Sequence, residues 1–329
     1  MNIAVFSTKS YDQEYFERYN TEYDYNFSFY ETALNADTAK LSADCNVVCV
    51  FVNDVVNEET IKILSSNGIQ LIALRCAGYN NVDLEAAEKA AIKVVRVPAY
   101  SPEAVAEHAL ALILTLNRKT HKAYNRVREG NFSLKNLIGF NLNNKTIGVI
   151  GTGKIGATFC KLLKGFGCKI IAYDIAENEE LVAEGVEFFP LEEVFDQSDI
   201  ISLHCPLNKH TKQIVNEDSI AKMKDGVMIV NTSRGALIKT EDAIEGLKNR
   251  KIGYLGIDVY EQEENLFFED LSEHIIQDDM ILRLLSFPNV LITSHQAYFT
   301  KEAMDQITTI TLENIKSFET DSELENEVK

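Results

Sequence analysis

The stretch that decides the fold is TIGVIGTGKIGATFCKLLKGFGCKIIAYD, residues 146–174. The run 146–150 predicts a strand, a helical pattern follows the glycines to Phe166, and a second strand at 169–173 ends at Asp174. A strand, a glycine-rich turn and a helix in this order, with an acid at the end of the next strand, indicate a dinucleotide-binding unit. The acid follows Gly151 by roughly 20 residues, the spacing that such units show.

Each glycine of this turn has a physical reason. Gly151 permits a tight turn, Gly153 lets the backbone approach a pyrophosphate, and Gly156 lets the helix pack close to the strand. The phosphates would lie at the helix N-terminus, against unpaired N–H groups and the positive end of the helix dipole. Asp174 would accept hydrogen bonds from the adenosine ribose and repel a 2′-phosphate, and residues 175–177 contain no arginine to compensate. The motif therefore predicts NAD, with NADH preferred over NADPH.

Short apolar runs alternate with helical patterns along nearly the whole chain, which is typical of parallel α/β architecture. Most of these runs are rich in Val and Ile, as in strands covered on both faces. Strands are predicted at 3–6, 47–51, 71–75, 94–97, 146–150, 169–173, 200–203, 228–231, 255–258 and 290–293. A helix is predicted at 58–67, ended by Gly68. The acidic tail 317–329 is expected to fray at its end.

The stretch 98–130 marks the boundary between two α/β blocks. Ser101 can cap a helix, Pro102 suits its first position, and Glu103 favours the positive dipole end. The pattern that follows predicts one helix over 102–129, roughly 40 Å long, that packs on one block or on a second subunit. Because the glycine motif starts near residue 150, a unit of about 100 residues precedes it, which fits an N-terminal substrate domain with a nucleotide domain inserted after it.

Composition excludes several classes of protein. The 329 residues carry a formal net charge of −18, which argues against nucleic acid and anionic membranes as partners. The six cysteines form no CxxC pair, which favours reduced thiols in the cytoplasm. Neither a signal-peptide pattern nor an apolar stretch of the ~18 residues that a membrane span needs is visible. Metal-ligand spacing is absent, so we expect a cytoplasmic protein without a metal.

Polar residues follow three predicted strands directly, at the edge where open α/β sheets bind ligands. These segments are NTSRG (231–235), DVYEQE (258–263) and TSHQA (293–297). The guanidinium of Arg234 suits bidentate binding of a carboxylate. His295 is the natural acid–base group for the interconversion of a carbonyl and an alcohol.

Six segments together resemble the D-isomer-specific 2-hydroxyacid dehydrogenase family over nearly the whole chain. They are RCAGYNNVD (75–83), VPAY (97–100), GTGKIG (151–156), HCPL (204–207), NTSRG and SHQA (294–297). The resemblance implies two α/β domains with Rossmann- or flavodoxin-like parallel sheets and an active site in the cleft between them. It implies a substrate domain of residues 1–100 plus 299–329, to which the C-terminal helix returns, and an inserted NAD-binding domain of residues 101–298. The implied reaction is the reversible reduction of pyruvate to D-lactate by NADH.

The resemblance also implies roles for single residues. Arg234 would bind the substrate carboxylate and polarise the keto oxygen, and His295 would donate the proton in reduction and accept it in oxidation. Glu263 would hydrogen-bond to His295. Glu261 and Glu264 are near neighbours that spacing alone does not exclude, and the family's acid five residues after Asp258 selects Glu263.

The implied binding residues fall into two groups. On the cofactor side they are Gly151, Gly153, Lys154, Ile155, Gly156, Asp174, Cys205, Pro206, Thr232, Ser233, Arg234 and Asp258, the last near the nicotinamide carboxamide. On the substrate side they are the backbone N–H groups of Cys76, Ala77 and Gly78, with Tyr100, Arg234, His295 and Tyr298. The remaining candidates are interpreted as structural: the histidines 108, 121, 210 and 274 as structural or exposed, and Asp278 and Asp279 as a helix N-terminus.

Alternatives stay open at this point. Dehydrogenases for bulkier 2-oxo acids share the mechanism, since pocket size is not visible in a sequence. A phosphoglycerate-type enzyme is less favoured because only about 30 residues follow Tyr298, and a formate dehydrogenase relative would have glutamine at position 263. An NAD-sensing protein-binding scaffold is the alternative from another class. The family and the long apolar helix imply a homo-oligomer, either a dimer or a tetramer.

Overall fold

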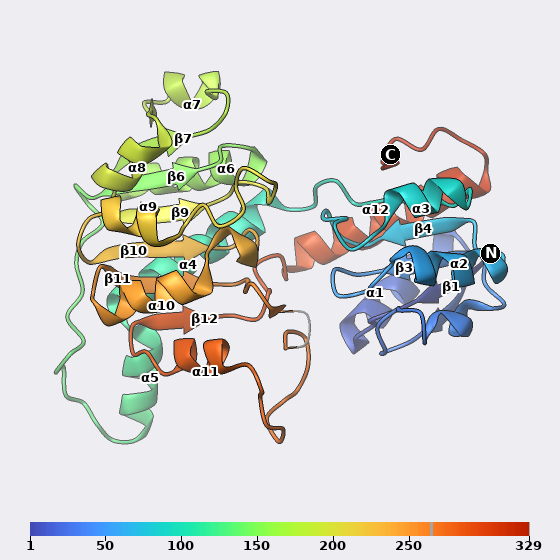
Figure 1. Ribbon diagram of the computed structural model, residues 1–329, viewed down its shortest axis with the longest axis horizontal. Coiled ribbons are helices and arrows are strands. Elements are labelled where there is room, and N and C mark those ends of the chain that lie inside the picture. Colours follow the sequence, from blue (N-terminus) through green and yellow to red (C-terminus); the bar gives the residue numbers. More distant parts are fainter. Residues whose placement is uncertain (264–265, 329) are drawn as a thin grey trace. The chain divides into compact units, whose positions relative to one another are not determined.

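The computed structural model describes residues 1–263 and 266–328 of the chain. The chain forms two units, one of Met1–Ser101 with Phe299–Lys329 and the other of Pro102–Tyr298. Each unit is built on its own parallel sheet (Figure 1). The predicted fold class, two parallel-sheet α/β domains, is therefore confirmed.

Unit 1 has a five-stranded sheet in the order β2-β1-β3-β4-β5, which is the strand order of flavodoxin-like folds. Its strands are β1 (Asn2–Val5), β2 (Asn26–Phe29), β3 (Val47–Val50), β4 (Leu71–Leu74) and β5 (Lys93–Val95). The strand order reverses between β1 and β3, so the crevice at the carboxyl ends of these two strands is where such a sheet binds ligands.

Helices cover the sheet of unit 1. They are α1 (Ser10–Tyr19), α2 (Glu58–Ser66), α3 (Leu84–Lys89) and α12 (Lys301–Glu319), with the 3₁₀ turns η1 (Asn20–Glu22) and η2 (Ala39–Ser42). On one face, Phe16 of α1 and Leu312 and Ile315 of α12 pack with strand side chains in a buried core. The predicted helix at 58–67 is α2, and Gly68 follows it with a φ of +84°.

The end of the chain is paired with the sheet up to Val328. The N–H of Val328 donates to the carbonyl of Val94 at 2.8 Å, and Glu327 forms an antiparallel bridge with Val95. The expectation that the tail 317–329 frays at its end is therefore wrong as far as Val328, and Lys329 lies outside the described residues. The physical reason is that β5 is an edge strand, whose unpaired backbone groups can accept a further segment.

Unit 2 has a seven-stranded sheet in the order β12-β11-β10-β9-β6-β7-β8. Its strands are β6 (Thr146–Ile150), β7 (Lys169–Tyr173), β8 (Glu187–Phe188), β9 (Ile200–Leu203), β10 (Val227–Asn231), β11 (Ile252–Ile257) and β12 (Val290–Ile292). All neighbouring pairs are parallel. This is the strand order of a Rossmann fold with one more strand at its edge, and the order reverses between β6 and β9.

Helices lie on both faces of the second sheet. They are α4 (Pro102–Arg118), α5 (Thr120–Arg128), α6 (Lys154–Leu163), α7 (Glu179–Ala183), α8 (Leu191–Gln197), α9 (Glu217–Lys222), α10 (Thr240–Lys248) and α11 (Asp279–Leu285), with η3 (Lys164–Phe166) and η4 (Gly235–Leu237). Successive residues of one strand belong to opposite cores: Val230 packs with α4 and α6, and Ile229 packs with α8–α11. Burial on both faces explains why these strands are apolar at successive positions.

The single helix predicted over 102–129 is wrong, because it is broken at Lys119. This residue has a left-handed φ of +51° and separates α4 from α5. The side chain of Asn117 pairs in both directions with the backbone of Phe140, and the ammonium of Lys119 donates to the carbonyl of Ile138. These contacts with residues 138–140 stabilise a turn that the helical pattern alone does not indicate.

All ten predicted strands are present, with ends that differ by up to three residues. Two further strands escaped prediction. In β2 exposed and half-buried residues alternate, and β8 has only two residues at the other sheet's edge. Neither presents the continuous apolar run by which covered strands are recognised.

The glycine-rich turn joins β6 to α6 through a close backbone contact. Gly156 is buried, and a Cβ atom added to it would lie 2.0 Å from the carbonyl oxygen of Gly151. Gly151 itself has a φ of +94°. A Cβ atom added to Gly153 would meet no atom within 4 Å, so space is open at the outer side of the turn.

We predict that Gly156→Ala destabilises the protein by about 1–3 kcal/mol, because the added methyl group forces the turn and α6 apart. Urea unfolding measures the change. Gly165→Ala is the matched control, since a Cβ there meets nothing within 4 Å. Equal stability of the two variants would contradict the close contact.

Candidate active site

Asp174, which follows β7, is hydrogen-bonded to the glycine-rich turn. Thr152 donates to Oδ2 of Asp174 from its N–H at 2.6 Å and from its Oγ1 at 2.9 Å, and the N–H of Ile175 donates to Oδ1 at 2.7 Å. The carboxylate is half-buried, and two oxygens have capacity for about four donors. Asp174 is therefore oriented by the turn and can still accept from a ligand.

The N-terminus of α6 offers donors to an anion. Gly153 is the N-cap and has no side chain to accept from the first helical N–H groups. Lys154 is exposed at the same place, and Ile155 is half-buried. Unpaired N–H groups, the dipole and a lysine suit a phosphate.

The loops after β9 and β10 are joined by a hydrogen bond from Oγ of Ser233 to the carbonyl of Cys205 at 2.7 Å. Thr232, beside Ser233, is only 8% exposed. Its buried hydroxyl has no partner among the described residues. An unpaired buried hydroxyl is costly unless a ligand completes it, so this edge of the sheet fits a polar cofactor. Pro206 is exposed on the same loop.

His204 is half-buried beside the glycine-rich turn, with its Nδ1 atom buried. Its Nε2 lies 2.8 Å from Oγ of Ser202, its ring packs on that of Phe159, and its Nδ1 has no partner in the described chain. Burial lowers the pKa of His204 to about 3. The imidazole is therefore neutral at physiological pH.

His295 and Glu263 form an ion pair or hydrogen bond, depending on the protonation of the ring. Nδ1 of His295 lies 2.8 Å from Oε1 of Glu263, while Oε2 accepts from the N–H of Tyr260 at 2.8 Å. The two side chains are 16% and 22% exposed. The structure describes no partner for Nε2 of His295, so this atom is available to a ligand.

The neighbouring acids differ in their contacts. Glu261 accepts from Nε2 of Gln213 and from both the N–H and Oγ1 of Thr240, so it ties the loop after β11 to α10. Glu264 lies outside the described residues. Of the carboxylates that the structure describes in this loop, that of Glu263 bonds to the ring of His295.

Asp258 follows β11 and is fully buried. Burial acts to raise its pKa, but hydrogen bonds from His108, Thr293 and the N–H groups of Gln296 and Ala297 outweigh this effect, so the pKa of Asp258 is lowered. The residue is therefore ionised and held by internal donors.

Arg234 lies in the loop after β10. Its Nη1 donates to the carbonyl of Ser233 at 2.7 Å, and its own carbonyl accepts from Nδ2 of Asn231. The next residue, Gly235, lies so close to the backbone of Tyr260 that a Cβ atom would be 2.0 Å from the carbonyl carbon. This contact holds the Arg234 loop against the loop that contains Glu263.

In unit 1, the loop Cys76–Gly78 follows β4 and directs its carbonyl oxygens inward. They accept from the N–H of Val97, from Nη1 of Arg96 and from Sγ of Cys76. The N–H groups of Ala77 and Gly78, which are predicted to bind a carboxylate, lie in this loop.

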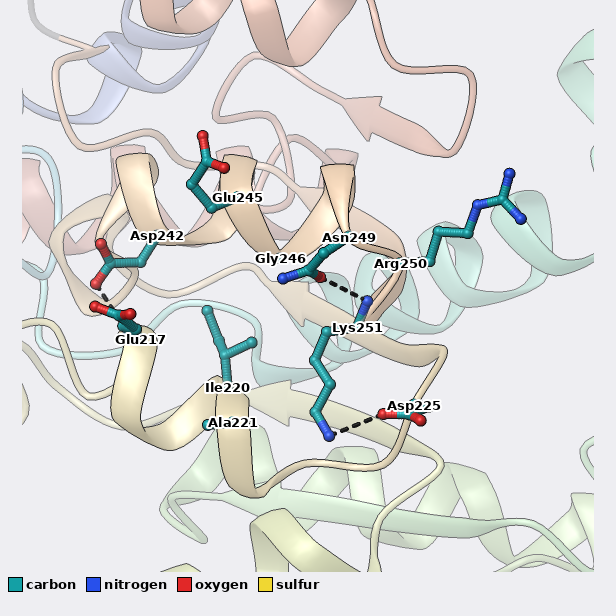
Figure 2. Close-up of a pocket in the computed structure, with 10 residues that line it drawn as sticks. All are labelled: Glu217, Ile220, Ala221, Asp225, Asp242, Glu245, Gly246, Asn249, Arg250 and Lys251. Atoms are coloured by element: carbon teal, nitrogen blue, oxygen red, sulfur yellow. Dashed lines mark hydrogen bonds and ion pairs between the residues drawn. The ribbon is translucent and has the colours of Figure 1, made fainter.

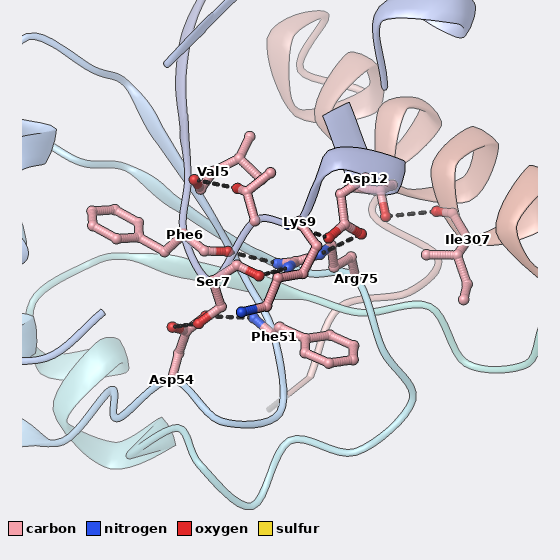
Figure 3. Close-up of polar contacts among 11 residues, drawn as sticks. Val5, Phe6, Ser7, Lys9, Asp12, Phe51, Asp54, Arg75 and Ile307 are labelled. Carbon is pink, nitrogen blue, oxygen red and sulfur yellow. Dashed lines mark hydrogen bonds and ion pairs between the residues drawn. The ribbon is translucent and has the colours of Figure 1, made fainter. Parts of the chain in front are cut away.

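Arg75, the residue before that loop, lies in a buried cluster of charged residues with Asp12 and Asp54 (Figure 3). Arg75, 2% exposed, donates to the carbonyls of Phe6 and Ser7 and lies 3.4 Å from Asp12. Asp54 accepts from Oγ of Ser7 and from the N–H groups of Leu34 and Phe51. Burial raises the pKa of Asp54, and Arg75 with these hydrogen bonds opposes the rise.

The two tyrosines predicted to line the substrate pocket lie in different units. Tyr100 is half-buried in unit 1, and Tyr298, 8% exposed, is the last residue of unit 2. His210 and His274 are exposed, and Asp278 is the N-cap of α11, as predicted.

The sequence analysis did not predict that His108 contacts the carboxylate of Asp258. Its Nε2 lies 3.0 Å from Oγ1 of Thr293. The available signal was that His108 interrupts the apolar stripe Val105, Ala109, Leu112 on its helix.

A hollow of about 670 Å³ lies between α9 and α10 (Figure 2). Its polar side chains include Asp242 and Glu245, and Lys251 pairs with Asp225 at 2.9 Å. It contains none of the predicted site residues.

Among the residues described, no helix has the length and hydropathy for a bilayer span. In the same residues, no group of three or more acids, histidines or cysteines is arranged to hold a metal ion.

We predict that His204 makes stability fall in mild acid. Its folded pKa of about 3 lies below the ordinary 6.5, so the unfolded chain binds a proton that the folded chain does not. Stability is then lost by about 1.4 kcal/mol for each pH unit below 6.5. Between about pH 7.5 and pH 5, the wild-type free energy of unfolding in urea should fall by about 2 kcal/mol more than that of His204→Gln. Parallel curves for the two proteins would show that His204 is not held neutral.

Comparison with known proteins places the chain in a family. The family described as "D-isomer specific 2-hydroxyacid dehydrogenase, NAD binding domain" matches residues 110–297. The D-lactate dehydrogenase of Escherichia coli is 50% identical over 328 residues, 100% of both chains.

Solved structures agree with this assignment. The apo-structure of D-lactate dehydrogenase from Escherichia coli has a TM-score of 0.92, with 47% identity over 100% of both chains. A structure described as the pyruvate reductase of Chlamydomonas reinhardtii has a TM-score of 0.94, with 44% identity over 99% of this chain and 98% of that one. The chain belongs to the D-isomer specific 2-hydroxyacid dehydrogenases, a family of NAD-dependent oxidoreductases, and unit 2 contains the family's NAD-binding domain.

Proposed function

We propose that the protein reduces pyruvate to D-lactate with NADH and catalyses the reverse oxidation. The observation that carries the proposal is the pairing of His295 with Glu263 at 2.8 Å, which leaves Nε2 of the imidazole available to a substrate oxygen. Two similar proteins described as a D-lactate dehydrogenase and a pyruvate reductase support a small 2-oxo acid as substrate.

The proton is assigned to His295. In reduction, Nε2 of the imidazolium donates its proton to the keto oxygen, and in oxidation the neutral ring accepts the hydroxyl proton. Glu263 binds Nδ1, which fixes the orientation of the ring and stabilises its positive charge. The N–H of Tyr260 holds the other carboxylate oxygen, so Glu263 is itself oriented.

We propose two sets of donors for the substrate carboxylate. Arg234 would bind it with its guanidinium fork and polarise the keto oxygen. The N–H groups of Ala77 and Gly78 are the second set of donors, with Cys76 in the same loop. Tyr100 and Tyr298 would line the substrate pocket. We accordingly assign unit 1 as the substrate domain and unit 2 as the cofactor domain.

The residues of unit 2 fit NAD, which when bound supplies or accepts the hydride at substrate C2. The turn Gly151–Gly156, with Lys154 and Ile155, would hold the pyrophosphate, and Asp174 the adenosine ribose. The unpaired hydroxyl of Thr232 supports a polar ligand beside Ser233, Cys205 and Pro206. Because the carboxylate of Asp174 would repel a 2′-phosphate, we propose that NADH is preferred over NADPH.

We also propose a homo-oligomer in the cytoplasm, either a dimer or a tetramer. Phe132, Leu134 and Ile138 are 75%, 82% and 85% exposed in the segment after α5. The backbone of this segment is held by Arg126, which donates to the carbonyl of Lys135, so apolar side chains are presented on an ordered surface. Such a patch suits contact with a second copy of the chain.

A panel of 2-oxo acids tests the function. We expect rapid loss of NADH absorbance at 340 nm with pyruvate, and at least 10-fold slower loss with NADPH because of the charge of Asp174. Turnover of bulky 2-oxo acids only would keep the mechanism and reject pyruvate. No turnover by protein that binds NADH would reject the enzyme and favour an NAD-sensing scaffold.

Substitutions at His295 and Glu263 test the proton assignment. His295→Gln should lower kcat by about 10²–10⁴-fold while NADH binding is retained, because only the proton donor is lost. Glu263→Gln should lower kcat by about 10–100-fold, because Nδ1 of the ring loses its hydrogen bond to a charged group. Glu261→Gln is the control, because Glu261 contacts Thr240 and Gln213 instead of His295. A kcat of Glu263→Gln that equals the wild-type value would remove Glu263 from the mechanism.

A further inference from the structure

The buried carboxylate of Asp258 determines the backbone that carries His295. Oδ1 accepts from the N–H of Gln296 at 3.0 Å, and Oδ2 accepts from the N–H of Ala297 at 2.8 Å. The main-chain carbonyl of Asp258 accepts from the N–H of His295 at 2.7 Å. Three consecutive N–H groups, at residues 295–297, are therefore bound by one residue.

The backbone at His295 depends on these bonds. Its φ of +48° lies in the left-handed region, which non-glycine residues seldom adopt without support. Before it, the ladder between β11 and β12 continues as the N–H of Thr293 donates to the carbonyl of Ile257. The turn at His295 begins where that ladder ends, and Asp258 supplies the acceptors that stabilise it.

Thr293 and His108 extend the network to α4. The hydroxyl of Thr293 donates to Oδ1 of Asp258 at 2.5 Å, and Nε2 of His108 lies 3.0 Å from that hydroxyl and 3.4 Å from Oδ1. An ionised carboxylate only accepts hydrogen bonds, so the Thr293 hydroxyl must be the donor to Asp258. The Thr293 oxygen then accepts from His108, which requires that Nε2 of His108 carry a proton.

We propose that Thr293 and His108 are positioning residues for His295 that act through the carboxylate of Asp258. The inference rests on the proposed function only in that His295 is the proton donor there. Neither residue needs to touch the substrate. Thr293 and His108 fix one carboxylate oxygen, the carboxylate fixes the N–H groups of residues 295–297, and these fix the ring that Glu263 orients.

Thr293→Val tests this order, because it keeps the shape of the side chain and removes the hydroxyl. We expect kcat for 2-oxo acid reduction to fall by about 10–100-fold, the effect of losing a hydrogen bond to a charged group, with little change in the KM for NADH. Thr293→Ser should restore kcat to within about 3-fold, since it keeps the hydroxyl. Thr311→Val is the control, because Thr311 is more deeply buried than the half-buried Thr293 but bonds only to the carbonyl of Ile307.

Amide hydrogen exchange of the protein without cofactor gives a readout that is independent of turnover. In Thr293→Val, the N–H groups of Gln296 and Ala297 should exchange at least 10-fold faster than in the wild type or in Thr293→Ser. This result also separates the two proposals. If no 2-oxo acid is reduced by the wild type but exchange at 296 and 297 accelerates, the proposed function fails and the positioning network stands.

A second pair of variants covers the case that Thr293→Val does not fold. His108→Leu should lower kcat and accelerate the same exchange, and His108→Gln, which keeps a donor near the position of Nε2, should recover most of both. In foldable variants, the loss in Thr293→Val/His108→Leu should be smaller than the product of the single losses, because both act on one carboxylate. Wild-type kcat and unchanged exchange at 296 and 297 in Thr293→Val and His108→Leu would overturn the proposal.

Discussion

Parallel strands impose the constraint on which the site depends: their carboxyl ends meet at one edge of the sheet. In unit 2 this edge collects the glycine-rich turn after β6, Asp174 after β7, Arg234 after β10, Asp258 after β11 and His295 after β12. Residues separated by up to about 140 positions in the chain are thereby brought to one edge. The chemistry follows from which side chains stand at those strand ends.

The loops at that edge are held to each other by polar contacts. Glu263 binds His295 with one oxygen and the N–H of Tyr260 with the other, and Gly235 presses against the same Tyr260 backbone. Ser233 joins the loop after β10 to Cys205 after β9. Because each loop is bonded to its neighbour, the positions of Arg234, Glu263 and His295 do not depend on any single loop alone.

Prediction from sequence worked where one local pattern determines the outcome. Covered strands, the turn around Gly156 and the N-cap Asp278 each have such a pattern. It failed where a distant contact decides: Asn117 bonds to Phe140 and the helix breaks at Lys119, and Val328 pairs with an edge strand that no pattern in the tail announces. The role of Glu263 was selected by family resemblance, because spacing does not distinguish it from Glu261. The network of His108 and Thr293 joins residues 185 positions apart, so only the fold reveals it.

Each sheet has a buried charged side chain at its carboxyl edge. These side chains bond to backbone groups of the loops that leave the strands. Residues that leave a strand carry N–H and C=O groups that no ladder satisfies, and burial makes such groups costly. A charged side chain can satisfy several of them at once: Arg75 donates to the carbonyls of Phe6 and Ser7, and Asp258 accepts from Gln296 and Ala297. A well-packed apolar residue could match the stability of a buried ion, but it could not bond to those backbone groups. The buried charges therefore fix the positions of the loops that contain Phe6 and Ser7 in unit 1 and His295 in unit 2.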